Sequence, residues 1–171
     1  IIPDRIEAGT FLIGVALTGG EVTLRNVNPK HLGIVISKLK EVGTDIKCDS
    51  DSITIRSSGK INPVDMTTGV YPGFPTDLQA QWMALMCIAS GDSTVIDEVY
   101  YDRFTHMAEL SRFGAKLSLV DNVATVKGIE TFYGAPVMST VIRASASLIL
   151  AAMAAQGTSE ISRIYHMDSC P

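Results

Sequence analysis

Hydrophobic residues recur first with helical spacing and then with strand spacing in the opening part of the chain. The apolar run that follows Asp4 and Glu7 has helical spacing, the two acids have the spacing of a capping box, and Gly19 provides a stop. Asn28 precedes a second helical run. The elements predicted here are a helix over 6–17, a strand over 21–25, a helix over 31–42, and strands over 45–47 and 52–56.

The same order of elements recurs farther along the chain, and this internal repeat is the strongest feature of the pattern. Gly19 and Gly91 end matching helices 72 residues apart, and Gly43 and Gly114 do so 71 residues apart. The second set of predicted elements is a strand beginning near 64, a helix from 76, a strand over 93–99, a helix over 102–113, and strands over 116–120 and 123–127. Two matched stops at nearly one offset indicate a repeated unit.

A third set of elements begins but is left incomplete. It contains a strand over 135–138, a helix over 144–155 and a strand over 160–162, without a second helix or closing strands. We therefore expect the natural protein to continue beyond Pro171. The chain is predicted to form one domain of three units, about 1–62, 63–130 and 131–171, with the third unit unfinished.

The first helix of each unit is apolar almost all round, which suits a buried position. Runs 6–17 and 144–155 show this most clearly. The sequence thus predicts an α/β fold in which strand-helix-strand-helix-strand-strand units pack around an axis, with these helices inside and the sheets outside.

Composition narrows the functional classes without naming one. The chain has 171 residues, a formal net charge of -4 and 46% hydrophobic residues, and the charge argues against a nucleic-acid binder. No apolar run approaches the length of a membrane span, and residues 1–4 show no export signal. The three cysteines and three histidines are scattered, so we expect a reduced, cytoplasmic protein with neither a metal site nor a cofactor.

The segment 71–81 combines stiffness with an acidic group at a helix start. Its prolines hold an extended approach, and Thr76 with Gln79 has the spacing of a capping box at the mouth of the next helix. One interpretation is that Thr76 and Asp77 only start this helix. The other is that the rigid loop aims the Asp77 carboxylate into a cleft.

The first helices of the three units begin at equivalent places, at 4–5, 76–77 and 140–141, with Arg143 just inside the third. If the units pack around a common axis, these helix starts face the same way, and their amides would favour phosphate or carboxylate groups. Arginines near the same starts could add bidentate contacts to such anions, and each could equally form a surface salt bridge. These arginines are Arg5, Arg103 and Arg143.

Several ordered segments together resemble the UDP-N-acetylglucosamine enolpyruvyl transferase family. They are 3–10 (PDRIEAGT), 71–81 (YPGFPTDLQAQ), 102–106 (DRFTH), 143–147 (RASAS) and 163–168 (RIYHMD). The resemblance covers nearly the whole chain and corresponds to most of one of that family's two domains. It implies the family's inside-out α/β (α+β) barrel, which agrees with the repeat.

The resemblance also implies a reaction. Members transfer the enolpyruvyl group of phosphoenolpyruvate to the 3-hydroxyl of UDP-N-acetylglucosamine, the first committed step of bacterial peptidoglycan synthesis. Asp77 matches the aspartate that contacts the sugar hydroxyl and is the implied base. Val99 matches a main-chain contact to the nucleotide sugar, with Tyr100 beside the uracil. The matching cleft residues are Asp4, Arg5, Arg103, Arg143 and His166.

Departures from the family pattern leave alternatives open. The family's reactive cysteine belongs to the other domain, so the implied partners are the two substrates and a missing N-terminal domain of the same chain. Val141 stands in place of a cleft aspartate and Ser169 in place of an arginine that binds phosphoenolpyruvate. We therefore expect this piece alone to be inactive. The alternatives are a non-catalytic homologue that binds the nucleotide sugar or a partner, and the enolpyruvyl transferase of the shikimate pathway.

Overall fold

The computed structural model describes residues 2–139 and 142–163, and of residues 142–144 only the backbone. The helices are α1 (Arg5–Thr18), α2 (Gly33–Val42), α3 (Gln79–Cys87), α4 (His106–Arg112) and α5 (Ile142–Ala154), with short 3-10 turns η1 (Pro29–Leu32) and η2 (Thr76–Leu78). The strands are β1 (Gly20–Arg25), β2 (Asp45–Cys48), β3 (Ser52–Ser57), β4 (Met66–Thr67), β5 (Ser93–Ile96), β6 (Lys116–Val120), β7 (Val123–Lys127), β8 (Phe132–Tyr133), β9 (Pro136–Met138), β10 (Ala155–Gln156) and β11 (Glu160–Ser162).

Two sheets share one order of equivalent strands. The first runs β1-β3-β2 and the second β4-β5-β7-β6, with β1 and β5 each antiparallel to the third strand of its own set. Among the described residues, only the second carries an additional parallel strand, β4, beside β5. The repeat predicted from the helix stops is therefore present in the strand topology. The remaining strands form the parallel pairs β8–β10 and β9–β11.

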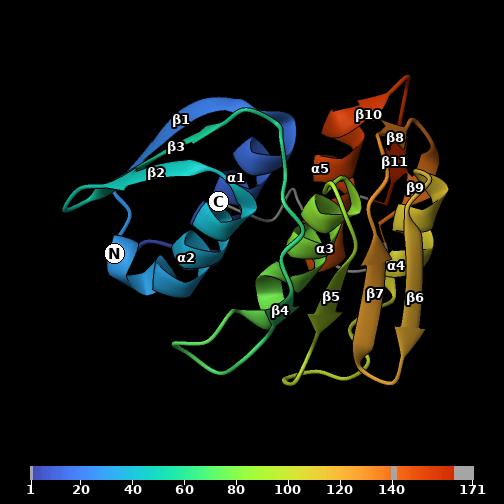
Figure 1. Ribbon diagram of the computed structural model, residues 1–171, viewed down its shortest axis with the longest axis horizontal. Helices are drawn as coiled ribbons and strands as arrows, with labels where there is room; N and C mark the ends of the chain where they lie inside the picture. Colours follow the sequence, from blue (N-terminus) through green and yellow to red (C-terminus); the bar gives the residue numbers. More distant parts are fainter. Residues whose placement is uncertain (1, 140–141, 164–171) are drawn as a thin grey trace.

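Helices α1, α3 and α5 pack on one another between the two sheets, as Figure 1 shows. Strand β3 alternates buried and accessible positions, with Ile53 and Ile55 fully buried. On its outer side, Thr23 and Thr54 share a hydrogen bond of 2.9 Å between exposed hydroxyls. The sheets thus place one face on the helices and the other in solvent, the arrangement expected from the apolar helices.

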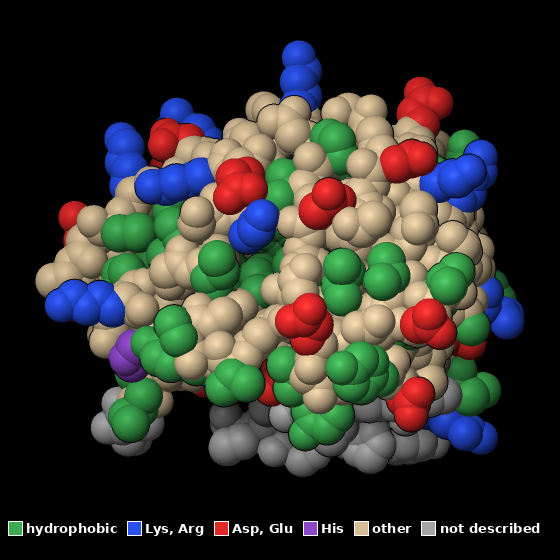
Figure 2. Space-filling model, turned by 60° about the horizontal axis from the view of Figure 1, so that its bottom comes forward, with side chains coloured by type: hydrophobic (Ala, Val, Ile, Leu, Met, Phe, Trp, Pro, Cys, Tyr) green, Lys and Arg blue, Asp and Glu red, His purple; other side chains and the backbone are tan. Residues whose placement is uncertain are grey.

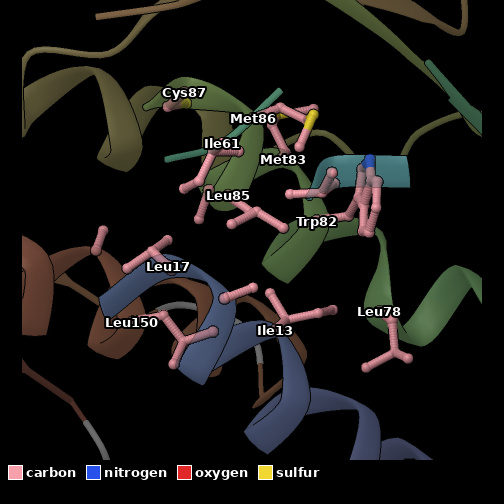
Figure 3. Close-up of a cluster of buried hydrophobic side chains, with 14 of the residues drawn as sticks. Ile13, Leu17, Ile61, Leu78, Trp82, Met83, Leu85, Met86, Cys87 and Leu150 are labelled. Atoms are coloured by element: carbon pink, nitrogen blue, oxygen red, sulfur yellow. The ribbon is translucent and has the colours of Figure 1, made fainter. Parts of the chain in front are cut away.

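The core between the helices is continuous and apolar. Figure 3 shows Ile13 of α1, Leu150 of α5 and the side chains of α3 pointing into one cluster. Every residue of α3 is buried, including Gln79 and Gln81. Trp82 is the only tryptophan of the chain, and its ring stands edge-on to Phe74, with the ring centroids 5.3 Å apart. A helix buried on all sides must pack on the rest of the fold in one orientation, which fixes the residues at its start.

Helix ends predicted from the sequence are confirmed for α1 and α2, whereas α3 ends at Cys87 rather than at the predicted stop, Gly91. The Asp4 carboxylate caps α1 by accepting the amides of Ile6 and Glu7, at 2.7 and 3.3 Å. Gly43 follows α2 in the left-handed conformation, with φ 112°, which an L side chain rarely adopts. Among the described residues, no helix is both long and apolar enough to cross a membrane.

Three expectations about the second unit were wrong in detail. No side chain caps η2 or α3, so Thr76 and Gln79 do not form a capping box. Strand β5 ends at Ile96 rather than at 99, and α4 begins at His106 rather than at 102. Two of these differences share a cause, because the buried Asp97 accepts the Thr76 hydroxyl and the amides of Val99 and Tyr100, which directly follow β5.

Candidate functional site

The loop from 68 to 75 closes on itself before it reaches η2. Gly69 donates its amide to the carbonyl of Phe74 at 2.9 Å, and Gly73 donates to the carbonyl of Val70 at 2.7 Å. A Cβ at Gly73 would lie 3.0 Å from the backbone of Gly69, so the closure leaves no room for a side chain there. The loop therefore delivers Thr76 from a constrained support.

Asp97 is the centre of the hydrogen bonds that hold this loop. Its side chain is fully buried, and Oδ1 accepts the Thr68 hydroxyl at 2.8 Å and the amides of Val99 and Tyr100 at 3.0 and 2.8 Å. Oδ2 accepts the Thr76 hydroxyl at 2.7 Å. One carboxylate thus joins the 68–75 loop, the start of η2 and the turn that follows β5.

Arg103 lies across the start of η2. Its Nη1 donates to Thr76 Oγ1 at 3.0 Å and to Asp77 Oδ1 at 2.8 Å. The guanidinium carbon also lies 4.3 Å from the centroid of the Tyr100 ring. The Arg103 and Asp77 side chains are 26% and 24% exposed, so the ion pair lies at the protein surface but is shielded on one side. The arrangement presents a carboxylate, a cation and an aromatic ring together.

The start of α1 lies beside the start of η2 and α3. Arg5 stacks over the Tyr71 ring, with its guanidinium carbon 4.8 Å from the ring centroid. One turn farther, Thr10 Oγ1 accepts a hydrogen bond of 3.1 Å from Gln81 Nε2. Thr10 and Gln81 are 71 residues apart, the offset of the internal repeat, so the two helices run side by side in equivalent register. Two of the three predicted helix starts are therefore neighbours.

Asp4 has a second environment besides its cap. Together with Glu7, Phe11 and the end of β1, it lines a hollow of about 260 Å³. Because its carboxylate accepts the amides of Ile6 and Glu7, these two groups of α1 are already occupied by an internal anion. The anion-binding capacity expected of this helix start is correspondingly reduced.

The start of α5 is described only in part. Ser139 and Ser145 share a short buried hydrogen bond between their hydroxyls. The side chain of Arg143, and all of Val141, His166 and Ser169, lie outside the described residues. The structure thus brings Asp77, Arg103, Tyr100 and Val99 together and places Arg5 nearby, while the positions of Arg143 and His166 remain predictions.

Two further titratable groups, His106 and Cys87, are buried. Burial lowers the pKa of His106 to about 4, and its ring stacks on that of Phe104 with the centroids 6.4 Å apart. Burial also raises the pKa of the Cys87 thiol to about 12. Both groups are neutral at physiological pH, and we assign neither a chemical role.

Sequence reasoning missed Asp97 and assigned Thr76 to the wrong partner. The signal that could have found Asp97 is its place directly after the apolar strand 93–96 and before two residues whose amides it accepts. An aspartate in this position is typical of an Asx turn. Nothing in the sequence marks its contact with Thr76, which is 21 residues away.

One face of the molecule carries side chains of both charges without a concentration of either (Figure 2). Lysine and arginine side chains on the face shown in Figure 2 are scattered among acidic ones and do not gather in one patch. Several hydrophobic side chains lie along the lower part of this face. Exposed aromatic residues of the region described above are Tyr71, Tyr100 and Tyr101.

Comparison with protein families gives a match along nearly the whole chain. Residues 1–170 match the EPSP synthase (3-phosphoshikimate 1-carboxyvinyltransferase) family. The sequence is 50% identical over 168 residues to a UDP-N-acetylglucosamine 1-carboxyvinyltransferase of Geotalea daltonii and 51% identical over 165 residues to that of Chlorobium chlorochromatii. These matches cover 98% and 96% of this chain but 40% and 39% of the relatives, so the chain spans about two fifths of their length.

Solved structures give the same picture of the fold. The enolpyruvyl transferase NikO of Streptomyces tendae is 26% identical, with a TM-score of 0.86 over 98% of this chain and 40% of that one. An EPSP synthase of Acinetobacter baumannii, at 20% identity and a TM-score of 0.73, covers 97% of this chain and 42% of its own. The second likeness concerns the fold alone. The predicted enolpyruvyl transferase type of α/β architecture is thereby confirmed.

Proposed function

Because the chain belongs to the EPSP synthase family, we propose that the protein containing it transfers the enolpyruvyl group of phosphoenolpyruvate to the 3-hydroxyl of UDP-N-acetylglucosamine. The observation that carries this proposal is the identity of about 50% to proteins named UDP-N-acetylglucosamine 1-carboxyvinyltransferase, over 98% of the chain. The shikimate-pathway enzyme, whose acceptor would be shikimate 3-phosphate, is the less favoured alternative. The EPSP synthase structures share the fold with this chain at only 12–20% sequence identity.

The reaction needs a base, an acid and positive charge, and the candidate site contains a carboxylate that could be the base and a cation beside it. The sugar hydroxyl oxygen forms a bond to C2 of phosphoenolpyruvate while its proton passes to a base, and the C3 methylene takes a proton from an acid. Loss of a C3 proton and of phosphate then restores the double bond, which gives the enolpyruvyl ether and free phosphate. In this scheme the Asp77 carboxylate is the base for the hydroxyl. Its ion pair with Arg103 supports this by holding the carboxylate in place.

The other roles follow from the same arrangement. We propose that Val99 contacts the nucleotide sugar through its main chain and that the exposed Tyr100 ring lies beside the uracil. Arg103 holds Asp77 and contributes positive charge near the phosphates. The further residues proposed to line the cleft are Asp4, Arg5, Arg143 and His166.

The remaining length of the relatives supplies the rest of the proposed enzyme. We propose that this chain is one domain of three units, and that a second domain of the same polypeptide closes over the helix starts and provides the reactive cysteine acid. The protein then acts in peptidoglycan synthesis in the cytoplasm. Alone, this chain is proposed to be inactive, because half of the cleft is absent.

Phosphate release by the full-length protein tests the proposal. With UDP-N-acetylglucosamine and phosphoenolpyruvate present, the unaltered protein should release phosphate, whereas shikimate 3-phosphate should not replace the sugar nucleotide. Asp77→Asn should lower kcat by about two to four decades, because the carboxylate is lost with little change in shape. Asp92→Asn, at the opposite end of α3 and exposed, is the matched control and should leave kcat unchanged.

Two results would contradict this function. Release of phosphate from phosphoenolpyruvate with shikimate 3-phosphate as the acceptor, but not with the nucleotide sugar, would reassign the acceptor. A kcat of Asp77→Asn within about threefold of the unaltered protein would return Asp77 to a structural role at the start of the helix.

A non-catalytic homologue is the second candidate, and two residues favour it. Valine at 141 cannot relay a proton, and serine at 169 cannot supply a cation. If the unaltered protein binds UDP-N-acetylglucosamine without turnover, the pair of changes Val141→Asp and Ser169→Arg should raise turnover by orders of magnitude. No gain would remove the support that these residues give.

A further inference from the structure

Asp97 is a fully buried carboxylate to which the proposed reaction assigns no role. It accepts hydrogen bonds from two hydroxyls and two main-chain amides, at distances of 2.7 to 3.0 Å. A buried carboxylate with so complete a set of donors is held in one position. It lies one hydrogen bond from Thr76, which is itself in contact with Arg103.

The direction of the hydrogen bonds in this network is fixed by the groups themselves. A carboxylate can only accept, so the single hydroxyl proton of Thr76 points to Asp97 Oδ2. A guanidinium can only donate, so Arg103 Nη1 gives its proton to the lone pair that Thr76 leaves on the other side. The same Nη1 also donates to Asp77 Oδ1, at 2.8 Å. The order of donation is therefore Arg103 to Thr76 to Asp97.

We propose that Asp97 is a positioning residue for the reaction: by fixing the Thr76 hydroxyl as an acceptor toward Arg103, it sets the place of the Arg103–Asp77 pair. The catalytic part of this inference rests on the proposed function, in which Asp77 is the base. Thr76 is the link, since it touches both Asp97 and Arg103. Displacement of a reacting group by about 1 Å can cost a hundredfold in rate, so such positioning has a measurable effect.

Asp97→Asn tests the network most directly, because asparagine has the shape of aspartate but replaces one accepting oxygen by a donating NH2 group. The amides of Val99 and Tyr100 require an acceptor at Oδ1, so the asparagine oxygen must stay there. Its NH2 group then faces Thr76 and donates where Oδ2 accepted. The Thr76 proton has to turn toward the side on which Arg103 donates, and two donors compete there.

The first experiment measures kcat, KM and thermal stability of the full-length protein with UDP-N-acetylglucosamine and phosphoenolpyruvate. Asp97→Asn is expected to lower kcat ten- to a hundredfold, with a smaller change in KM for either substrate. Asp65→Asn is the matched control, since Asp65 is exposed and also accepts an amide of β5, from Thr94 at 2.7 Å, but has no contact with Thr76. It should leave kcat unchanged.

The link through Thr76 is tested by combining substitutions. Thr76→Val removes the hydroxyl and should lower kcat by a similar factor, whereas Thr76→Ser keeps it and should stay within about threefold. In the Thr76→Val background, Asp97→Asn should lower kcat little further, because the hydrogen bonds that join Asp97 to Arg103 through the Thr76 hydroxyl are already absent. If the two losses multiply, or if Asp97→Asn lowers stability while kcat stays within twofold, the inference is overturned. If Asp97→Asn does not fold, the inference is judged on the Thr76 variants alone: it stands if Thr76→Val lowers kcat and Thr76→Ser does not, and it is overturned otherwise.

A second measurement separates this inference from the proposed function. The guanidinium signals of Arg103 in nitrogen-15 NMR spectra report its hydrogen bonds without any turnover. Slow exchange of the Nη1 protons should be lost in Asp97→Asn and kept in Asp65→Asn. If the unaltered protein releases no phosphate, the proposed function fails and this measurement still tests the positioning. Unchanged Arg103 signals in Asp97→Asn would overturn it.

Discussion

Gly9 provides a direct test of whether the starts of α1 and η2 lie together. It sits in the interior of α1, and a Cβ built on it would lie 2.5 Å from Leu78 Cδ1 and 3.3 Å from Cδ2. Leu78 is fully buried, so its methyl groups cannot move into solvent. Because carbon atoms pack best at 3.5 to 4.0 Å, Gly9→Ala should push the two elements apart by about 1 Å.

The magnitude follows from two opposing effects. Alanine in place of glycine in a helix interior stabilises by about 1 kcal/mol, whereas overpacking in a core costs about 1 to 3 kcal/mol. We expect Gly9→Ala to lower the free energy of unfolding by about 1 kcal/mol. In a Leu78→Ala background, which itself costs about 2 to 5 kcal/mol, the clash is gone. There the same change should stabilise by about 1 kcal/mol, so the coupling between positions 9 and 78 is about 2 kcal/mol.

Urea unfolding of the four proteins, followed by circular dichroism, measures this coupling. The unaltered chain, both single variants and the double variant are compared in the full-length protein. If Gly9→Ala stabilises equally in both backgrounds, α1 and η2 are not in contact, and the neighbouring helix starts lose their support. Loss of kcat in Gly9→Ala with recovery in the double variant would further link the contact to the placement of Asp77.

Three further predictions concern burial. His106 has a pKa of about 4 in the folded protein against about 6.5 in the unfolded chain, so its neutral form is the folded one. Its contribution to the free energy of unfolding is therefore complete above pH 6.5 and is lost as the pH falls toward 4. Denaturation at several pH values should show this fall in the free energy of unfolding, and His106→Leu should not show it. The Cβ of Gly128→Ala would overlap the carbonyl oxygen of Ala89, so this change should lower the free energy of unfolding in urea by more than about 3 kcal/mol. A Cβ at Gly33 would have no atom within 4 Å, so Gly33→Ala should be neutral or stabilising. Equal effects of the two changes would contradict this packing. Iodoacetamide and mass spectrometry should find Cys87 unmodified in the native protein, because its thiol is buried with a pKa of about 12, and modification before unfolding would refute this.

Several helix ends and the repeat of elements along the chain were accessible from the sequence, because local chemistry and the hydrophobic pattern decide them. The Asp4 cap and the glycine at 43 require only their own neighbours in the chain, and both appear where expected. The 71–72-residue offset correctly predicted equivalent strands in two sheets, since the same hydrophobic pattern must bury the same face.

Contacts between distant segments were not accessible in this way. Thr76 has the spacing of a helix cap, yet its hydroxyl bonds to Asp97. The same aspartate accepts the amide of Val99, the last residue of the predicted strand, and that of Tyr100 just beyond it. A buried carboxylate that binds four donors outweighs local propensity, and only the fold reveals which donors these are.

The edge-on contact between Trp82 and Phe74 gives the chain an internal optical reporter. Phe74 belongs to the loop that delivers Thr76, and the indole is fully buried against it. Since no other tryptophan is present in these 171 residues, their indole emission comes from one place at the base of that loop. Rearrangement of the loop by a bound molecule would therefore change the emission without any attached dye.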